Sequence, residues 1–297
     1  MTSAMAFGDW MQAVQGSTES ALAKFLPPAA QAPTRLHQAM RYATLDGGKR
    51  VRPLLVQAAG LLFEADADCL ARAAVAVEMI HAYSLVHDDM PCMDDDALRR
   101  GKPTVHVQYD QATALLVGDA LQAQAFVVLT GIRTEPARVL AMTALLAQAA
   151  GSGGMCGGQA IDLASVGLEL SLQQLEQMHR LKTGALLHAA VLLGAWCGKT
   201  PSASETTALD AYALAIGLAF QVVDDVLDAT ADSVTLGKTA GKDAAANKPT
   251  YVSILGLDAS RQLAETLRDD AHRAIEPFGV KAQRLRELAD LIVQRRA

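Results

Sequence analysis

Aromatic side chains are scarce in this chain: they make up 4% of its 297 residues, although hydrophobic residues account for 51%. The core must therefore consist mostly of Ala, Leu and Val. Such a core suits closely packed helices better than a β-sandwich, which draws on aromatic and β-branched residues. The sequence also has no convincing strand pattern, no short repeat and no polar linker between domains. It predicts one all-α domain over residues 1–297, with about ten or more helices.

The chain also lacks an excess of basic residues and closely spaced cysteine pairs. The formal net charge is −6. A nucleic-acid partner is therefore not expected, because binding phosphates along a strand needs a basic surface. The four cysteines, Cys69, Cys92, Cys156 and Cys197, show no CxxC spacing. That absence argues against a zinc site or a disulfide framework and favours reduced thiols in the cytoplasm.

A secretion signal and a membrane span are not expected either. Residues 1–10 lack a basic segment followed by an apolar stretch. The longest apolar runs, around residues 185–197 and 211–223, fall short of about 18 residues and include His188 and Gln221. We therefore expect a soluble cytoplasmic protein with no membrane span.

Apolar periodicity and capping residues predict where the helices lie. Ser171 with Gln174, and Ser202 with Glu205, are capping signatures at helix N-termini. The predicted helices cover residues 9–26, 31–45, 53–64, 67–87, 110–131, 136–150, 171–197, 202–229, 258–276 and 281–296.

Two glycine-containing segments interrupt this pattern. Residues 151–158 lack the spacing of a nucleotide-binding loop, so we interpret them as a turn or a place of close packing, with Gln159 and Asp162 on their far side. Lys182-Thr183-Gly184 lies inside the predicted helix 171–197, where a glycine usually permits a kink or close packing.

The densest charge in the chain is acidic. Five aspartates fall within the nine residues 88–96, directly after the apolar stretch 73–86, and Arg99 and Arg100 follow them. Carboxylates collected at the end of a buried element repel one another and cost free energy unless cations neutralise them. Hard divalent cations, which prefer carboxylate oxygens, are the natural counter-charge. On this stretch alone, a solvated acidic loop remains the alternative.

A second acidic cluster closes the predicted helix 202–229. Counted from Gln221, Asp224 lies at i+3, Asp225 at i+4 and Asp228 at i+7. Gln221, Asp228 and either Asp224 or Asp225 therefore form one stripe of the helix. Like charges in one stripe destabilise a helix, and a helix C-terminus disfavours anions further. This local cost invites a compensating ligand.

Basic residues gather at the start of another predicted helix. Lys49, Arg50 and Arg52 stand beside Gly47-Gly48 and just before or within the first turn that Pro53 favours. Cations next to the free N–H groups of a helix N-terminus make an anion site, with a solvated basic turn as the alternative.

The helix that leads into the first acidic cluster has one polar face. His81, Ser84 and Asp88 are spaced i, i+3 and i+7 and share that face. Tyr83 lies five residues before Asp88, about 7.5 Å deeper along the helix axis. A single Tyr or His in such a position is more often a packed core residue than a functional one.

Together these features indicate a phosphorylated ligand with an apolar tail. Two carboxylate clusters that face each other across a bundle would hold divalent ions, and Mg²⁺ bridges carboxylates to phosphate oxygens. Arg and Lys side chains take the remaining phosphate oxygens. Apolar helices lie below, with no evident nucleophile or redox group, so we expect a prenyl diphosphate as substrate. The basic residues available for it are Lys49, Arg52, Arg99, Arg100, Lys182 and Lys238.

Five ordered motifs resemble those of the trans-isoprenyl diphosphate synthases. They span about residues 40–255, and no motif position departs from the family pattern. In chain order they are Gly47-Gly48-Lys49-Arg50-Val51-Arg52-Pro53, Asp88-Asp89-x4-Asp94 with Arg99-Arg100-Gly101, Lys182-Thr183-Gly184, Phe220-Gln221-Val222-Val223-Asp224-Asp225, and Asp224-Asp225-x2-Asp228.

The resemblance implies the isoprenoid synthase fold, in which a single-domain helical bundle surrounds a central apolar cavity. It also implies a homodimer and a role for each motif residue. About three Mg²⁺ ions per site, with Mn²⁺ as an alternative, would be held by Asp88, Asp89, Asp94, Asp224, Asp225 and Asp228. The allylic diphosphate would contact Arg99, Lys182, Lys238 and Lys248, with Thr183 and Gln221 nearby. Isopentenyl diphosphate would be held by Lys49, Arg52, His81 and Arg100, and Gly48 is a further substrate-binding residue. The residues expected to matter most for catalysis are Asp88, Asp94, Arg99, Lys182, Asp224 and Lys238.

The implied reaction is a head-to-tail (1′-4) condensation. Isopentenyl diphosphate would add to dimethylallyl and then geranyl diphosphate, giving farnesyl diphosphate and pyrophosphate. In this family the residue five before the first motif lies along the product tunnel. Here that residue is the bulky Tyr83, with the small Ser84 beside it, which favours a C15 product.

Other members of the same fold remain as alternatives. They are a synthase of geranylgeranyl or geranyl diphosphate, and a non-catalytic regulatory subunit. Such subunits usually lose an aspartate motif, whereas both motifs stand here. A terpene cyclase would not need the Lys49 and Arg52 site for a second diphosphate.

Overall fold

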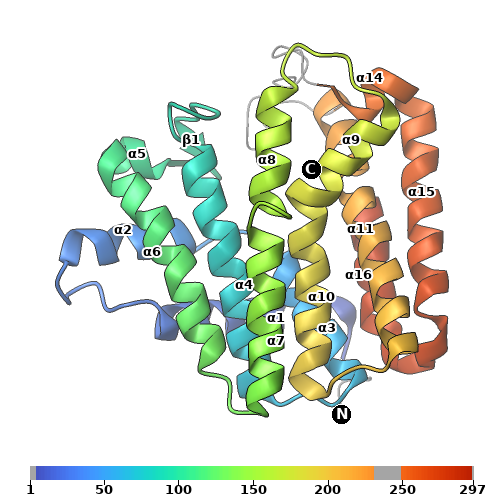
Figure 1. Cartoon of the computed structure of the whole chain (residues 1–297), viewed down its shortest axis with the longest axis horizontal. Helices are drawn as coiled ribbons and strands as arrows, with labels where there is room; N and C mark the ends of the chain where they lie inside the picture. The colour runs from blue at the N-terminus through green and yellow to red at the C-terminus, as the bar shows by residue number, and fades with distance from the viewer. Residues whose placement is uncertain (1–4, 231–248, 296–297) are drawn as a thin grey trace.

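Long apolar helices pack side by side in the computed structural model, which describes residues 5–230 and 249–295 (Figure 1). The all-α prediction is confirmed, and the strands in the described residues are two residues long each. The α-helices are α1 Phe7–Phe25, α2 Thr34–Thr44, α3 Val51–Leu62, α4 Ala67–Asp88, α5 Val105–Gln108, α6 Gln111–Thr130, α7 Pro136–Ala150, α8 Met155–Ala164, α9 Leu172–His179, α10 Ala185–Gly198, α11 Ala203–Thr230, α14 Tyr251–Leu255, α15 Leu257–Ala274 and α16 Gln283–Gln294. The strands are β1 Leu98–Arg99 and β2 Lys102–Pro103, the π-helical turn η2 is Arg180–Gly184, and the 3₁₀ segment η3 is Glu276–Ala282.

Helix α10 packs on α3, α4 and α11, and α3 also packs on α4. Helix α10 has no Asp, Glu, Lys or Arg and is buried on most sides, as expected for a helix that is apolar all round. Asp66 caps α4 by accepting hydrogen bonds from the N–H groups of Asp68 and Cys69. Because α4 ends at Asp88, its long apolar body places the first acidic cluster at the rim of the core.

The glycine-rich segment 151–158 was interpreted as a turn or a place of close packing, and both occur: a turn comes first, and the helix α8 that begins at Met155 packs closely through its glycines. A Cβ added at Gly158 would lie 2.1 Å from the backbone nitrogen of Lys182. The glycine is therefore required for the direct packing of α8 on η2, and this tertiary contact outweighs the low helix propensity of glycine. The interruption predicted at residues 182–184 is confirmed as the π-helical turn η2.

A short hairpin joins α4 to α5, and the sequence pattern did not predict it. Strands β1 and β2 pair antiparallel, with Arg99 opposite Lys102. Arg100 and Gly101 between them have φ values of 52° and 75°. Positive φ at both central residues is typical of a type I′ turn, whose twist matches that of the flanking strands.

The expectation that no apolar segment is long enough to cross a membrane is wrong. Five helical segments of the described chain are long and apolar enough by length and composition alone. In residues 67–88, 72% of the most apolar window is buried inside the protein, whereas the value for residues 136–164 is 33%. Packing in the bundle thus accounts for the apolar character of α4, and it leaves a partly open apolar face on α7 and α8.

A smaller apolar cluster joins α9, α11, α14 and α15, and the ring of a buried histidine packs against its Tyr251. His179 is 7% exposed and stacks on the ring of Tyr251, with ring centroids 5.6 Å apart. Neither ring nitrogen has a hydrogen-bond partner within the described residues. Burial lowers the pKa of His179 to about 4.

The depressed pKa of His179 predicts a loss of stability in acid. Below about pH 6.5 the unfolded chain takes up a proton at this residue that the folded protein does not, so stability falls between pH 6.5 and 4. Between pH 7 and pH 5, protonation of this residue in the unfolded chain is expected to lower the free energy of unfolding by about 2 kcal/mol. His179→Phe, which keeps the stack on Tyr251, should reduce the pH 7-to-5 stability loss by that amount in urea unfolding. His188→Phe is the control, and an unchanged loss in His179→Phe would contradict the prediction.

Candidate active site

A cavity of about 480 Å³ lies between α4, α8, η2 and α11. Asp88 and Asp224, one from each acidic cluster, line the same cavity. The predicted facing pair of carboxylate helices is thus brought together around one space. The other lining residues that matter below are Arg52, His81, Tyr83, Ser84, Cys156, Gln159, Lys182, Thr183, Phe220 and Gln221.

The first acidic cluster folds back on the end of α4. The N–H of Asp94 donates to the carbonyl oxygen of Asp88 at 2.8 Å, so both residues belong to one tight turn. Burial, together with the charge of Asp94, raises the pKa of Asp88 to about 6. Asp95 is exposed and has a φ of 50°. Asp88 therefore sits where a cation would relieve an unfavourable charge.

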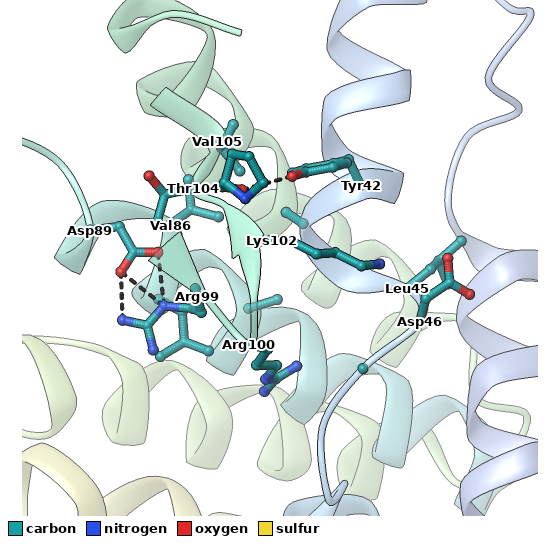
Figure 2. A pocket seen from close by; sticks show the side chains of 15 residues that line it. Tyr42, Leu45, Asp46, Val86, Asp89, Arg99, Arg100, Lys102, Thr104 and Val105 are labelled. Carbon is teal, nitrogen blue, oxygen red and sulfur yellow. Dashed lines mark hydrogen bonds and ion pairs between the residues drawn. The ribbon is translucent and has the colours of Figure 1, made fainter. Parts of the chain in front are cut away.

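Asp89 and Arg99 bond each other, as Figure 2 shows. The Arg99 Nε donates to both oxygens of Asp89 at 2.8 Å. They lie beside a separate cavity of about 80 Å³ under the hairpin, where the Tyr42 hydroxyl donates to the carbonyl of Pro103 at 2.7 Å (Figure 2). In this structure neither Asp89 nor Arg99 lines the 480 Å³ cavity. The metal role of Asp89 and the diphosphate role of Arg99 stay predictions.

In the second acidic cluster, as in the first, one aspartate lines the 480 Å³ cavity and another bonds elsewhere in the protein. Asp224 lines the cavity and accepts a hydrogen bond from Nη2 of Arg295 at 2.6 Å. Asp225 is buried, and its Oδ2 accepts the N–H of Tyr251 at 2.7 Å, which anchors α14. Asp228 is half-buried one turn further along α11. Asp224 is thus the member of this cluster that reaches the cavity.

The π-helical turn η2 presents two polar side chains to the same cavity. The Lys182 ammonium forms an ion pair with the buried carboxylate of Asp162 on α8. The Thr183 hydroxyl donates to Oε1 of Gln221 at 2.8 Å. Because a π-helical turn adds a residue to the helix, it turns Lys182 and Thr183 toward the cavity without ending the α9–α10 helix.

A second pocket, of about 860 Å³, collects the basic residues near the start of α3. Nε of Arg52 is buried and has no hydrogen-bond partner among the described residues, as expected of a group that awaits an anion. Gly48 has a φ of 94°, a backbone conformation that favours glycine, and the Arg100 guanidinium lies close beside it. The predicted isopentenyl diphosphate residues Lys49, Arg52, His81 and Arg100 line this pocket, as does the predicted substrate-binding Gly48.

His81 carries no charge in this setting. Burial, and then the charge of Arg52, lowers its pKa well below the ordinary value. It is therefore a neutral hydrogen-bonding group at pH 7. Lys238 and Lys248, which the sequence also assigned to the site, lie outside the described residues.

The basic pocket has a buried support. Arg50 has a φ of 52° and is 4% exposed. Its guanidinium donates to Glu78 at 2.6 Å and to Glu19 at 2.8 Å. Because α3 begins at Val51, this ion-pair cluster fixes the backbone between Lys49 and Arg52.

The donor atoms at the first cavity fit a magnesium site that is completed by its ligand. Among residues 5–230 and 249–295, no group of three or more His, Cys, Asp or Glu side chains forms a ready-made metal site. Mg²⁺ commonly takes one or two carboxylates together with phosphate oxygens and water. Asp88 and Asp224 on one cavity match that requirement, and a closed protein cage is not needed.

Four residues of the site had no role assigned from the sequence: Asp162, Glu78, Cys156 and Arg295. Asp162 and Glu78 are buried acids that pair with Lys182 and Arg50, and each lies far from its partner in sequence. An isolated acidic residue within an apolar helix, as in the α4 stretch around Glu78, is the signal that could have found them, because buried charges need a partner.

Comparison with known proteins agrees with this geometry. The family model described as "Polyprenyl synthetase" matches residues 33–280. A protein from Sinorhizobium fredii named "Probable farnesyl diphosphate synthase" is 52% identical over 282 residues, covering 94% of this chain and 85% of that protein. The farnesyl diphosphate synthase of Escherichia coli is 44% identical over 297 residues, with 98% and 99% covered.

Relatives named for a longer product are also similar. A chloroplastic geranylgeranyl pyrophosphate synthase from Arabidopsis thaliana is 47% identical over 268 residues, covering 89% of this chain and 77% of that protein. Among solved structures, an FPP/GFPP synthase from Zymomonas mobilis superposes with a TM-score of 0.87 at 43% identity, covering 97% of this chain and 98% of that one.

Proposed function

This chain belongs to the polyprenyl synthetase family, and we propose that it is a farnesyl diphosphate synthase. The enzyme is a prenyltransferase that adds isopentenyl diphosphate head-to-tail to dimethylallyl and then geranyl diphosphate. The observation that carries the proposal is the meeting of two cavities. Arg52, His81 and Phe220 line both the 480 Å³ cavity and the 860 Å³ basic pocket, so two diphosphates bound there would have their reacting ends close together.

The 480 Å³ cavity is the proposed allylic site. Lys182 lies at its polar end with Asp88 and Asp224, while Tyr83 lies deeper along α4. A diphosphate at the polar end would leave its prenyl chain directed toward Tyr83. Lys182 would then exchange its bond to Asp162 for one to phosphate, and Asp162 holds it in position until then.

The 860 Å³ pocket is the proposed isopentenyl diphosphate site. Arg52 and Arg100 supply charge, and the neutral His81 supplies a hydrogen bond without adding to the repulsion between them. Arg50 and Glu78 hold the backbone of this pocket in place before the ligand arrives, which lowers the cost of binding.

Catalysis follows from charge stabilisation and positioning. The C1–O bond of the allylic diphosphate breaks and leaves an allylic carbocation, C4 of isopentenyl diphosphate bonds to C1, and a proton from C2 passes to the released pyrophosphate. Asp88, Asp94 and Asp224, with Asp89, Asp225 and Asp228 in support, would hold Mg²⁺, and the bound metal would supply positive charge for the leaving pyrophosphate. The chain itself adds Lys182, and the hydrogen bond between Thr183 and Gln221 fixes polar oxygens beside the proposed carbocation position.

The test is one assay with purified protein, isopentenyl and dimethylallyl diphosphates and Mg²⁺. Farnesyl diphosphate and pyrophosphate are the expected products. A C20 or C10 product would favour a geranylgeranyl or geranyl diphosphate synthase of the same fold. An absence of turnover would contradict the proposed enzyme activity and favour a non-catalytic regulatory subunit.

We also propose that the protein is a homodimer in the cytoplasm, with no membrane span. All four cysteines are free thiols, as is usual in that compartment. Helices α6 and α7 pack on each other and expose large apolar side chains to solvent, a pattern typical of an interface. These side chains are Leu115, Leu116, Val127 and Leu140, each 50–70% exposed.

The dimer proposal predicts that charge on this face separates the subunits. Leu116 and Val127 are eleven residues apart on α6, about three turns, so they share one stripe. The double variant Leu116→Glu/Val127→Glu should convert a species of twice 31.3 kDa into a monomer in light-scattering measurements. Val280→Glu, at an exposed position on η3, is the control. A monomeric wild-type protein would contradict the proposal.

A further inference from the structure

We infer that Cys156 is a specificity-determining residue of the prenyl cavity, because it holds the Tyr83 ring in the position that limits product length. This inference rests on the proposed synthase function. It adds a residue from α8 to a length control that the sequence assigned to α4 alone.

The contact joins two residues 73 positions apart. The Tyr83 hydroxyl lies 3.5 Å from Sγ of Cys156, where either group could be the donor, and both residues line the 480 Å³ cavity. Tyr83 is 6% exposed, whereas Cys156 is exposed. The two side chains therefore meet at the wall of the cavity, with the thiol open to it.

The Tyr83 ring is restrained on a second side. The His87 ring packs against it edge to face, with centroids 5.8 Å apart, and Nε2 of His87 lies 3.1 Å from the carbonyl oxygen of Leu115 on α6. His87 fixes one side of the ring, and Cys156 fixes the hydroxyl end. Burial, and then the hydrogen bond to Cys156, raises the pKa of the Tyr83 hydroxyl, so it stays protonated.

The backbone that carries Cys156 has little freedom to move. A Cβ at Gly157 would lie 2.0 Å from the carbonyl oxygen of Ser152, and one at Gly158 would meet the backbone of Lys182 at 2.1 Å. The first turn of α8 is thus packed against η2 and the preceding loop. A rigid backbone makes the Cys156 thiol a fixed partner for Tyr83.

Ser84, the other residue assigned to product length, does not have this role. Its hydroxyl donates to the carbonyl oxygen of His81 at 2.9 Å, within its own helix. Loss of the Ser84 hydroxyl would leave Tyr83 in place. Loss of the Cys156 thiol would leave the Tyr83 hydroxyl in a largely apolar cavity without this partner and free the ring to turn aside.

Substitutions test this contact through the share of product longer than C15. Cys156→Ala and Tyr83→Phe should each raise that share about threefold, the change expected when one weak hydrogen bond is lost. Cys156→Ser, which keeps a donor and an acceptor, should restore the wild-type distribution. The double variant Cys156→Ala/Tyr83→Phe should match either single variant, because both changes remove the same contact. A wild-type distribution in Cys156→Ala would overturn the inference.

Alkylation of Cys156 is a second test, and it should shorten the product where the substitutions lengthen it. In a Cys92→Ser background, iodoacetamide should modify Cys156, since Cys69 and Cys197 are buried. The added bulk in the cavity should shift the product from C15 to C10, and peptide mass spectrometry would locate the modification. Modification of Cys156 with an unchanged product would also overturn the inference.

These results separate the inference from the proposed function. If the wild-type enzyme makes C15 and the Cys156 variants give the same product distribution, only the role of Cys156 is refuted. A wild-type protein that transfers no prenyl group would refute the synthase function itself. Circular dichroism and thermal unfolding of each variant would identify a change that only reflects loss of folding.

Discussion

Asp88→Asn is expected to lower kcat by about 10³-fold, because it removes a carboxylate from the place where charge develops in the reaction. Asparagine has nearly the same shape, so the packing around the end of α4 should persist. Steady-state rates at saturating diphosphates measure the effect. Calorimetric titration with Mg²⁺ in the presence of inorganic pyrophosphate should show weaker metal binding.

The same change should leave stability unchanged or improve it. Burial raises the pKa of Asp88 to about 6, so the folded protein prefers the neutral carboxyl, and ionisation at pH 7 opposes folding. A neutral asparagine removes that cost, a trade of stability for function that is common at active sites. Asp95→Asn is the matched control, since Asp95 is exposed and asparagine tolerates its positive φ. Asp88→Asn activity within about twofold of wild type would contradict the proposed role, given the loss expected above.

Tyr83→Ala is expected to make C20 the main product in place of C15. The ring is 6% exposed and lies along the cavity below Asp88. Its removal opens space for a further isoprene unit. Because one side of the ring borders the cavity, the stability cost should lie below the about 3–5 kcal/mol typical of a large aromatic residue in a closed core.

Product chromatography after incubation with isopentenyl and dimethylallyl diphosphates measures this change. Ser84→Ala is the matched control, because that hydroxyl bonds only within α4 among the contacts described above, and its product should stay C15. If Tyr83→Ala still gives C15, Tyr83 is not the floor of the cavity.

Much of the fold could be predicted because apolar periodicity and capping residues indicate where most of its helices lie. The capping box of Ser171 with Gln174 and the cap of Ser202 with Glu205 both occur as predicted. Helix α8 was not predicted, because glycine has a low helix propensity and the sequence does not show that Gly158 packs against the backbone of Lys182. Helix α14 is five residues long and too short for a periodic signal.

The candidate site could be predicted by residue type but not by pairing. The motifs place Asp88 and Asp224 near each other, and the structure puts both on one cavity. The bonds of Asp89 to Arg99 and of Asp224 to Arg295 depend on where side chains point in three dimensions. Sequence spacing carries no information on that, so these four residues gained partners that the sequence did not predict.

The wall formed by Tyr83 and Cys156 has an evolutionary consequence. Tyrosine codons reach serine and cysteine by single-base changes, and cysteine codons likewise reach phenylalanine and tyrosine. The first kind of change would deepen the cavity and the second would fill it, and neither would alter a charge in the site. Product length should therefore drift readily between descendants of one ancestral gene, while the chemistry of bond formation is inherited unchanged.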